Sequence, residues 1–412
     1  MAGEPQNGVR FGVELEFIVQ SSLPNDLTIT HNMDHANNRK SVALQLGRIT
    51  GLPFACQCKH GFFDNFCSIC IDVPNDLRLP SGCVIWPPRA IHGSWSQAQY
   101  HYYYVQWESL LSENVEENRA TRKGMEISTP IYDNNALTAG LPQLTQVVKA
   151  LPCVDRKIIC DSTCGLHVHV GLKQGMTLLL AKKMVTLVML LERCLIQPLL
   201  PASRAGSMWA LLICDHAYLN QQGNSCLTAA DLIKQLPDFR VHVPLTPTDM
   251  EPGGWNNHHP EKFFKDLLSM WRTENLDALR AGLLRNSIAK LGFVLCARTA
   301  PDTSKLEGSP STFEFRYPQM NFDMPFIRRW VEIFCRLGTI ANLDAVPYRR
   351  MLSVIVAVLN QLSTTRTPPW ELLLRALGLG HQVPGWQDQV RKHHSGINVS
   401  HVDRDGVLQP QE

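Results

Sequence analysis

Residues 164–171 alternate apolar side chains with two histidines and carry a glycine near each end of the segment. A period of two is typical of a β-strand, in which residues i and i+2 point to the same face. His167 and His169 would then project into one space, while the apolar residues between them pack on the other face. Two imidazoles aimed at one space suggest a metal, ligand or phosphate site. This segment therefore constrains both the fold and the function.

Three further segments place acidic or guanidinium groups on one face of a short strand: Glu14 with Glu16, Glu126, and Glu314 with Arg316. Each segment alone also fits a solvent-facing or ion-pairing strand, and the histidine pair alone also fits a satisfied core pair. Solvent-facing strands usually carry Thr, Lys and Ser as well, and these four segments carry almost none. Carboxylate oxygens suit Mg²⁺, and imidazole widens the choice toward Mn²⁺ or Zn²⁺. Together the segments indicate one shared cation site.

Composition and charge exclude several classes of protein. The net charge is +2 and no basic run is interleaved with aromatic residues, so we expect no nucleic-acid partner. The most apolar stretch, residues 176–200, is interrupted by charged side chains, so we expect no membrane span. The N-terminus shows no apolar signal segment, and an odd number of cysteines, 13, favours reduced thiols and a cytoplasmic location.

The pattern along the chain predicts an α+β fold. Strands are expected at residues 9–19, 102–107, 124–130, 164–171, 290–298 and 312–317. Helices are expected at residues 135–150, 176–198, 231–236, 260–281, 325–340, 346–362 and 368–377. This order favours an antiparallel or mixed sheet with helices on one face and a catalytic cavity, lined by the polar groups, on the other.

Residues 1–384 are expected to form a single catalytic domain. Within it, residues 21–104 are rich in Pro, Gly, Asn and Cys with little periodicity, so they are predicted to be an irregular Cys-rich insertion that sets the substrate. Residues 385–412 are predicted to be a polar C-terminal tail that frays.

Four cysteines of this insertion lie close together in the sequence: Cys56, Cys58, Cys67 and Cys70. Four thiolates can bind a structural Zn²⁺ tetrahedrally and hold a loop that has little core of its own. His60 is a substitute ligand. The Cys-x-Cys half and the short separation are unusual, so plain reduced cysteines are the favoured interpretation and a structural zinc the alternative.

The four motifs, in this order, resemble the amidoligase family, which is common in fungi and related to glutamine synthetase and glutamate–cysteine ligase. The matching segments are Phe-Gly-Val-Glu-Leu-Glu-Phe, Gly-Met-Glu-Ile-Ser-Thr-Pro, Cys-Gly-Leu-His-Val-His-Val-Gly and Thr-Phe-Glu-Phe-Arg, within residues 11–330. The resemblance implies a glutamine synthetase-like catalytic fold. It also implies an ATP-dependent carboxylate–amine ligase of specialised metabolism, which forms an amide through an acyl phosphate.

The resemblance further implies two sites for Mg²⁺ or Mn²⁺, one formed by Glu14, His167 and Glu314 and the other by Glu16 and Glu126. Polyphosphate is dense negative charge, and its transfer depends on positioning and charge neutralisation. The expected substrates are a small-molecule or peptide carboxylate and an amine or ammonia.

Three further residues receive roles from the resemblance. His169 would contact a nucleotide phosphate, and Arg316 would stabilise the transferring phosphoryl group. Arg204 would contact a phosphate or a substrate carboxylate, although it also fits a plain helix-terminal arginine. The family commonly continues the Glu-Phe-Arg strand with His, Gly and Thr, whereas here Tyr317 and Pro318 follow.

Two other functions remain open from the sequence. A metal-dependent hydrolase could use His167 and His169 on zinc with a glutamate as base, but it would need further histidines at later strand ends. The candidates for these are His216, His242, His258 and His259. The second alternative is an inactive ligase fold that serves as a binding module.

Overall fold

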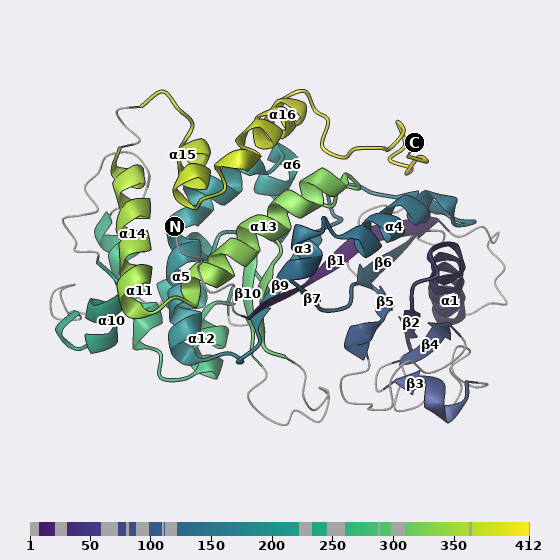
Figure 1. Cartoon of the computed structure of the whole chain (residues 1–412), viewed down its shortest axis with the longest axis horizontal. Coiled ribbons are helices and arrows are strands. Elements are labelled where there is room, and N and C mark those ends of the chain that lie inside the picture. Colours follow the sequence, from purple (N-terminus) through teal and green to yellow (C-terminus); the bar gives the residue numbers. More distant parts are fainter. Residues whose placement is uncertain are drawn as a thin grey trace.

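The computed structural model describes residues 8–20, 31–58, 73–79, 82–87, 99–108, 111, 122–221, 233–244, 260–286, 289–297, 310–361 and 365–411. Its strands are β1 (Val9–Gln20), β2 (Phe54–Gln57), β3 (Arg78–Leu79), β4 (Gly82–Trp86), β5 (Tyr103–Trp107), β6 (Arg122–Ser128), β7 (Tyr132–Asp133), β8 (Lys157–Ile159), β9 (Leu166–Leu172), β10 (Phe293–Cys296) and β11 (Thr312–Phe315). They form one sheet in the order β10-β11-β9-β1-β6-β5-β2-β4-β3, and β7 and β8 also pair with β1 (Figure 1). Only the pairing of β2 with β5 is parallel among these strands, so the sheet is mixed.

The helices are α1 (His31–Thr50), α3 (Asn134–Thr138), α4 (Pro142–Ala150), α5 (Leu178–Leu191), α6 (Ala202–Ala205), α7 (Ile213–His216), α8 (Tyr218–Gln221), α10 (Pro237–His242), α11 (Pro260–Arg272), α12 (Leu276–Gly282), α13 (Met324–Ala341), α14 (Ala345–Asn360), α15 (Pro369–Ala376) and α16 (Val383–His394). The predicted helix at 135–150 is divided into α3 and α4, because Gly140 and Leu141 adopt positive φ angles and Pro142 starts the second helix. Within the described part of the chain, no helix combines the length and the apolar character that crossing a membrane requires.

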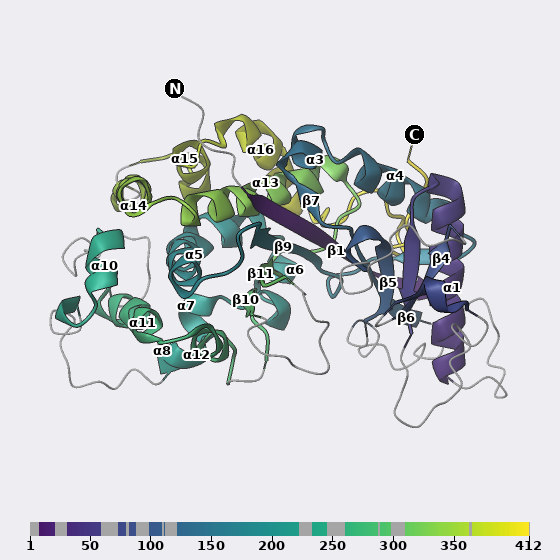
Figure 2. The same ribbon diagram turned by 60° about the horizontal axis from the view of Figure 1, so that its bottom comes forward.

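The apolar residues of the alternating strands face a layer of helices. Leu15 of β1 lies opposite Leu166 of β9 and Ile127 of β6, and all three are fully buried. Helix α13 lies along β1 and β9, as Figure 2 shows, and α1 packs on β2, β4 and β5. An ideal Cβ on Gly338 of α13 would stand 2.8 Å from Cγ1 of Val170 in β9, so helix and sheet are in close contact. The predicted α+β fold with a mixed sheet and helices on one face is confirmed.

The prediction of an irregular insertion at residues 21–104 is wrong for much of its length. Residues 31–50 form α1, and β2, β3 and β4 extend the main sheet. The first half of α1 is rich in His, Asn and Asp, which are poor helix formers, and this obscured the helix. Its second half buries Val42, Ala43 and Leu46 against the sheet, which supplies the stability that intrinsic propensity does not.

The prediction of a fraying tail at residues 385–412 is also wrong. Trp386 of α16 is fully buried and its ring lies 4.9 Å from that of Trp330. Further on, the Leu408 N–H donates to the Ile158 carbonyl at 2.8 Å, and the Cys160 N–H donates to the Gly406 carbonyl at 3.0 Å. A few buried apolar side chains, such as Trp386 and Leu408, hold this polar segment against the rest of the protein. Because they are few and far apart, they produce almost no periodic pattern in the sequence.

Candidate active site

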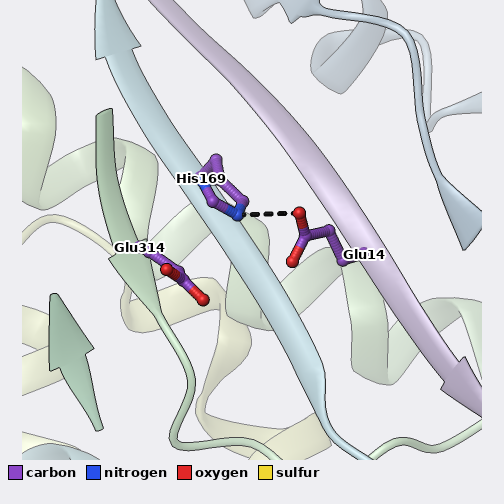
Figure 3. A group of neighbouring side chains, drawn as sticks. All are labelled: Glu14, His169 and Glu314. Atoms are coloured by element: carbon purple, nitrogen blue, oxygen red, sulfur yellow. Dashed lines mark ion pairs between the residues drawn. The ribbon is translucent and has the colours of Figure 1, made fainter. Parts of the chain in front are cut away.

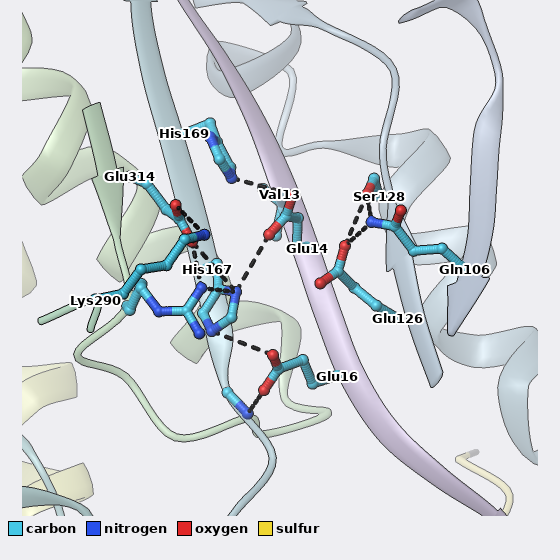
Figure 4. Close-up of polar contacts among 12 residues, drawn as sticks. Val13, Glu14, Glu16, Gln106, Glu126, Ser128, His167, His169, Lys290 and Glu314 are labelled. Carbon is cyan, nitrogen blue, oxygen red and sulfur yellow. Dashed lines mark hydrogen bonds and ion pairs between the residues drawn. The ribbon is translucent and has the colours of Figure 1, made fainter. Parts of the chain in front are cut away.

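The strand register brings the predicted acidic and imidazole residues to one face of the sheet. It sets them in three opposed pairs: Glu14 with His167, Glu16 with Glu126, and Glu314 with His169. Directly opposed residues in antiparallel strands point to the same side of the sheet. These side chains therefore project from β1, β6, β9 and β11 away from the layer of helices formed by α1 and α13 (Figure 4).

Glu14 bridges the two histidines of β9. Its Oε1 lies 3.1 Å from Nε2 of His169 and its Oε2 lies 3.2 Å from Nδ1 of His167 (Figure 3 shows the first contact). On the other side of His167, Nε2 lies 3.4 Å from Oε1 of Glu16, whose Oε2 accepts the backbone N–H of Gly165 at 2.5 Å. The imidazoles and carboxylates thus form one continuous cluster.

Three groups in this cluster hold ligand atoms within 4.8 Å of one another: Glu14, His169 and Glu314; Glu14, Glu126 and His167; and Glu16, Glu108 and Glu126. The predicted group of Glu14, His167 and Glu314 is not one of these three, although Nδ1 of His167 lies 3.2 Å from Oε2 of Glu14 and 4.0 Å from Oε1 of Glu314. His169 joins Glu14 and Glu314 because β11 pairs Glu314 directly with His169, a register that the sequence alone does not specify.

The donor set fits a divalent cation. Nε2 of His167 and Nε2 of His169 are buried, and among the described residues neither has a hydrogen bond of good geometry despite the nearby carboxylates. Nδ1 of His169 lies 3.0 Å from the Thr312 hydroxyl, which orients the ring from behind. An imidazole fixed through one nitrogen with the other facing carboxylates is the usual arrangement of a metal-ligating histidine.

The charge balance of the cluster also favours a cation. Burial raises the pKa of Glu126 well above its ordinary value, and the charges of Glu14 and Glu16 raise it further. Burial also disfavours the charged form of Glu14, but His169 and His167 outweigh it and hold the pKa of this carboxyl well below its usual range. A bound cation would therefore offset the burial and the neighbouring negative charges that disfavour ionised Glu126.

Glu314 has two cationic partners. Nη1 of Arg316 donates to Oε1 of Glu314, and Nζ of Lys290 donates to both oxygens, at 3.2 and 2.9 Å. Burial works against the charged carboxylate, but Arg316 and Lys290 outweigh it and place the pKa of Glu314 well below its ordinary range. Nη1 of Arg316 also lies 3.4 Å from Nδ1 of His167, so this guanidinium reaches the centre of the cluster.

Arg204 lies beside the cluster but is itself buried. Its Nε, Nη1 and Nη2 donate to the backbone carbonyls of Tyr317, Thr163 and Arg316 at 3.1, 3.3 and 2.9 Å. Burial lowers the pKa of its guanidinium to about 10. The side chain ties the segment after β11 to the turn before β9, which favours a positioning role over direct contact with a ligand.

Several residues of the site were not predicted from the sequence: Gln106, Glu108, Ser128, Lys290 and Thr312. Gln106 and Ser128 donate to Oε1 of Glu126. The alternation of β5, β6 and β11 places Gln106, Ser128 and Thr312 on the polar face, so that pattern could have identified them. Lys290 precedes β10, where no pattern in the sequence points to the site.

Only two residues of the predicted zinc cluster, Cys56 and Cys58, lie among the described residues. Cys67, Cys70 and His60 lie outside the described residues. Cys56 and Cys58 are buried, and neither forms a disulfide with another described cysteine. Cys56 lies opposite Cys83 in the pairing of β2 with β4, and a hydrogen bond with Cys83 together with burial raises the pKa of the Cys56 thiol well above its ordinary value. A structural zinc stays a prediction.

Comparison with known proteins agrees with this geometry. The sequence profile of a family described as "Putative amidoligase enzyme" matches residues 7–235, more than half of the chain. The chain belongs to this amidoligase family. Membership indicates an enzyme that forms carbon–nitrogen bonds. Searches against curated proteins and against solved structures gave no significant match.

The matched region contains Glu14, Glu16, Glu126 and both histidines of β9, whereas Glu314 and Arg316 lie beyond it. The pairing of β11 with β9 brings these two residues to the same face as the others.

Proposed function

We propose that the protein is an ATP-dependent carboxylate–amine ligase that uses Mg²⁺ or Mn²⁺ and forms an amide through an acyl phosphate. The observation that carries the proposal is the cluster of overlapping ligand groups on one face of the sheet, above all Glu14 with His169 and Glu314, and Glu16 with Glu108 and Glu126. Family membership supports the amide-forming reaction. A relationship to glutamine synthetase and an origin in fungal specialised metabolism belong to the same proposal.

The residues of the cluster would divide the work of phosphoryl transfer. Glu14, His169 and Glu314 would hold one cation, and Glu16 with Glu126 would hold a second with help from Glu108. A bound divalent cation supplies the positive charge that polyphosphate requires.

Arg316 would stabilise the transferring phosphoryl group, because a planar guanidinium can contact two oxygens at once. Its own carbonyl is held by Arg204, which would keep Arg316 in register with the cations. The acid that receives the phosphoryl group would be a small-molecule or peptide carboxylate, and the nucleophile that follows would be an amine or ammonia. The free thiols of the described cysteines support a reducing compartment, and we place the reaction in the cytoplasm.

The hydrolase alternative gains little support from the described residues. His216 ends α7 and His242 ends α10, and neither shares a ligand group with His167 or His169. His258 and His259 lie outside the described residues. A hydrolase would also give no role to Arg316 beside Glu314.

The proposal is tested by ADP release. The protein is incubated with ATP and Mg²⁺ and with pools of carboxylic acids and amines, and products are examined for a new amide by mass spectrometry. Glu14→Gln and Arg316→Ala should each lower the rate on the order of a hundredfold, since each removes charge stabilisation of the transferring group. The exposed Glu274→Gln serves as the matched control and should retain the rate.

Two results would contradict the proposal. Equal rates in wild type and both site variants would remove the site from the reaction. Amide cleavage that needs a metal but consumes no ATP would favour the hydrolase, and ATP binding without turnover in any pool would favour the inactive binding module.

A further inference from the structure

Lys290 makes an ion pair with a residue that the proposed cation site also needs. Its Nζ lies 2.9 Å from Oε2 and 3.2 Å from Oε1 of Glu314, and it reaches the carboxylate from the β10 side (Figure 4). The Glu314 side chain is 1% exposed, whereas that of Lys290 is 52% exposed. The ammonium therefore lies at the boundary between the buried carboxylate and solvent.

The carboxylate of Glu314 has no remaining acceptor capacity. Oε1 accepts from Arg316 and from Lys290, and Oε2 accepts from Lys290 and from the thiol of Cys296 at 3.3 Å. A carboxylate offers about four lone-pair sites, and the four contacts from these three donors use them all. A divalent cation coordinated by Glu314 together with Glu14 and His169 must therefore displace one of the donors.

Lys290 is the donor best suited to leave. Its side chain is half exposed, so the released ammonium regains water, and it is a compact charge on a flexible stem. Arg316 is only 12% exposed, its backbone N–H donates to Gly292 at 2.7 Å, and its guanidinium also contacts His167. Cys296 is neutral, so its loss would not relieve the repulsion between a cation and a neighbouring positive charge.

We propose that Lys290 is an exchangeable countercharge of Glu314, which a divalent cation must displace, so that Lys290 and the cation compete for the same carboxylate. This inference rests on the proposed cation site. It predicts that the lysine weakens cation binding although it stands beside the ligands. A lysine with a merely structural role would have the opposite effect or none.

The test is the affinity of the full-length protein for Mn²⁺ alone, measured without nucleotide by electron paramagnetic resonance of the free ion. Lys290→Met removes the charge and keeps much of the stem. It should tighten Mn²⁺ binding by about tenfold or more, because a like charge next to the site is removed. Lys290→Arg keeps the charge and should bind Mn²⁺ as wild type does, within about twofold.

The chain offers a matched control. Lys262 is 51% exposed and pairs at 2.6 Å with Asp266, which is 5% exposed, in α11. Lys262→Met removes the same charge from a similar pair away from the site and should leave the Mn²⁺ affinity unchanged. Circular dichroism checks folding, and Lys290→Gln replaces Lys290→Met if the latter does not fold.

The possible results distinguish a failure of the Lys290 competition from a failure of the proposed cation site. Wild type that binds Mn²⁺ while Lys290→Met binds it equally or more weakly overturns the competition alone and leaves the cation site standing. Failure of both wild type and Lys290→Met to bind Mn²⁺ overturns the cation site, and the competition with it. If Lys262→Met tightens Mn²⁺ binding as much as Lys290→Met does, the effect comes from the overall charge of the protein, and the proposal is overturned.

Discussion

Glu192 is a fully buried carboxyl group outside the candidate site. It begins a π-helical turn, Glu192–Ile196, that extends α5, a kind of helix irregularity often found near functional sites. Its carboxylate accepts the N–H groups of Ile213 and Cys214 at 2.7 and 3.0 Å, and the Tyr317 hydroxyl also donates to it. Because Tyr317 follows Arg316 directly, this contact anchors the segment after β11 that carries the Arg316 guanidinium.

The first prediction concerns the pH dependence of stability. Burial raises the pKa of Glu192 from 4.5 to about 7. Between these values the folded protein holds a proton that the unfolded chain has lost, so this group makes the free energy of unfolding fall as pH rises from about 4.5 to 7 and level off above. The full effect is about 3 kcal/mol.

Urea unfolding of wild type and Glu192→Gln at pH 5, 6, 7 and 8 measures it. The variant should show the shallower decline, and parallel curves for the two proteins would contradict the assignment.

A second prediction at this scale concerns Glu126. Because burial and two neighbouring carboxylates raise its pKa, its charged form is unfavourable in the absence of a bound cation. Glu126→Gln keeps an oxygen to accept from Gln106 and Ser128 and should stabilise the protein by about 1 kcal/mol at pH 8 in EDTA. The same variant should bind Mn²⁺ about tenfold more weakly. Thermal melts in EDTA give the change in stability, and melts at increasing Mn²⁺ concentrations give the change in Mn²⁺ affinity. A Glu126→Gln variant that is less stable than wild type in EDTA would contradict the prediction that ionised Glu126 is unfavourable without a cation.

At the scale of elements, α13 packs directly on β9, the strand that carries His167 and His169. A change in this contact should therefore shift the side chains of the candidate site. The Cβ added by Gly338→Ala would meet Val170 at 2.8 Å, and Val170 adjoins His169 on the same strand. Overpacking costs about 1–3 kcal/mol, which the gain in helix propensity of about 1 kcal/mol offsets only in part. We expect a lower melting temperature and reduced ADP release. Thr339→Ala, at the next position of α13, is the control and should be close to neutral.

Alternation in the sequence predicts the elements that carry the site. β1, β6, β9 and β11 all lie where apolar and polar residues alternate, because one face is packed and the other carries polar side chains, whereas β5 and β10 are mostly apolar. The alternation also identifies Glu14, Glu16, Glu126, His167, His169 and Glu314 as residues of one face. It cannot predict the pairing of Glu314 with His169, because register depends on contacts distant in the sequence. For the same reason the sequence does not predict the position of Lys290, which depends on the path of the chain before β10.

At the scale of the whole molecule, the C-terminal segment covers the edge of the sheet at β8. Deleting residues 403–412 removes the hydrogen bonds of Leu408 to Ile158 in β8 and of Gly406 to Cys160 just after it, and exposes the site of the buried Leu408 side chain. The expected loss is about 3–4 kcal/mol, from about 2 kcal/mol of apolar burial and about 1 kcal/mol for each hydrogen bond. Leu408→Ala isolates the apolar part. A deletion that melts at the wild-type temperature would show that this segment adds no stability.

The ligands of the cluster come from almost the whole length of the chain, since Glu14 lies in the first strand and Glu314 in the last. Bringing such distant residues together requires large loops to close, which slows folding. During synthesis, β1 and β9 emerge from the ribosome long before β11, which carries Glu314. The proposed cation site of Glu14, His169 and Glu314 would therefore be among the last parts of the protein to form, and a fragment that ends before β11 would lack it.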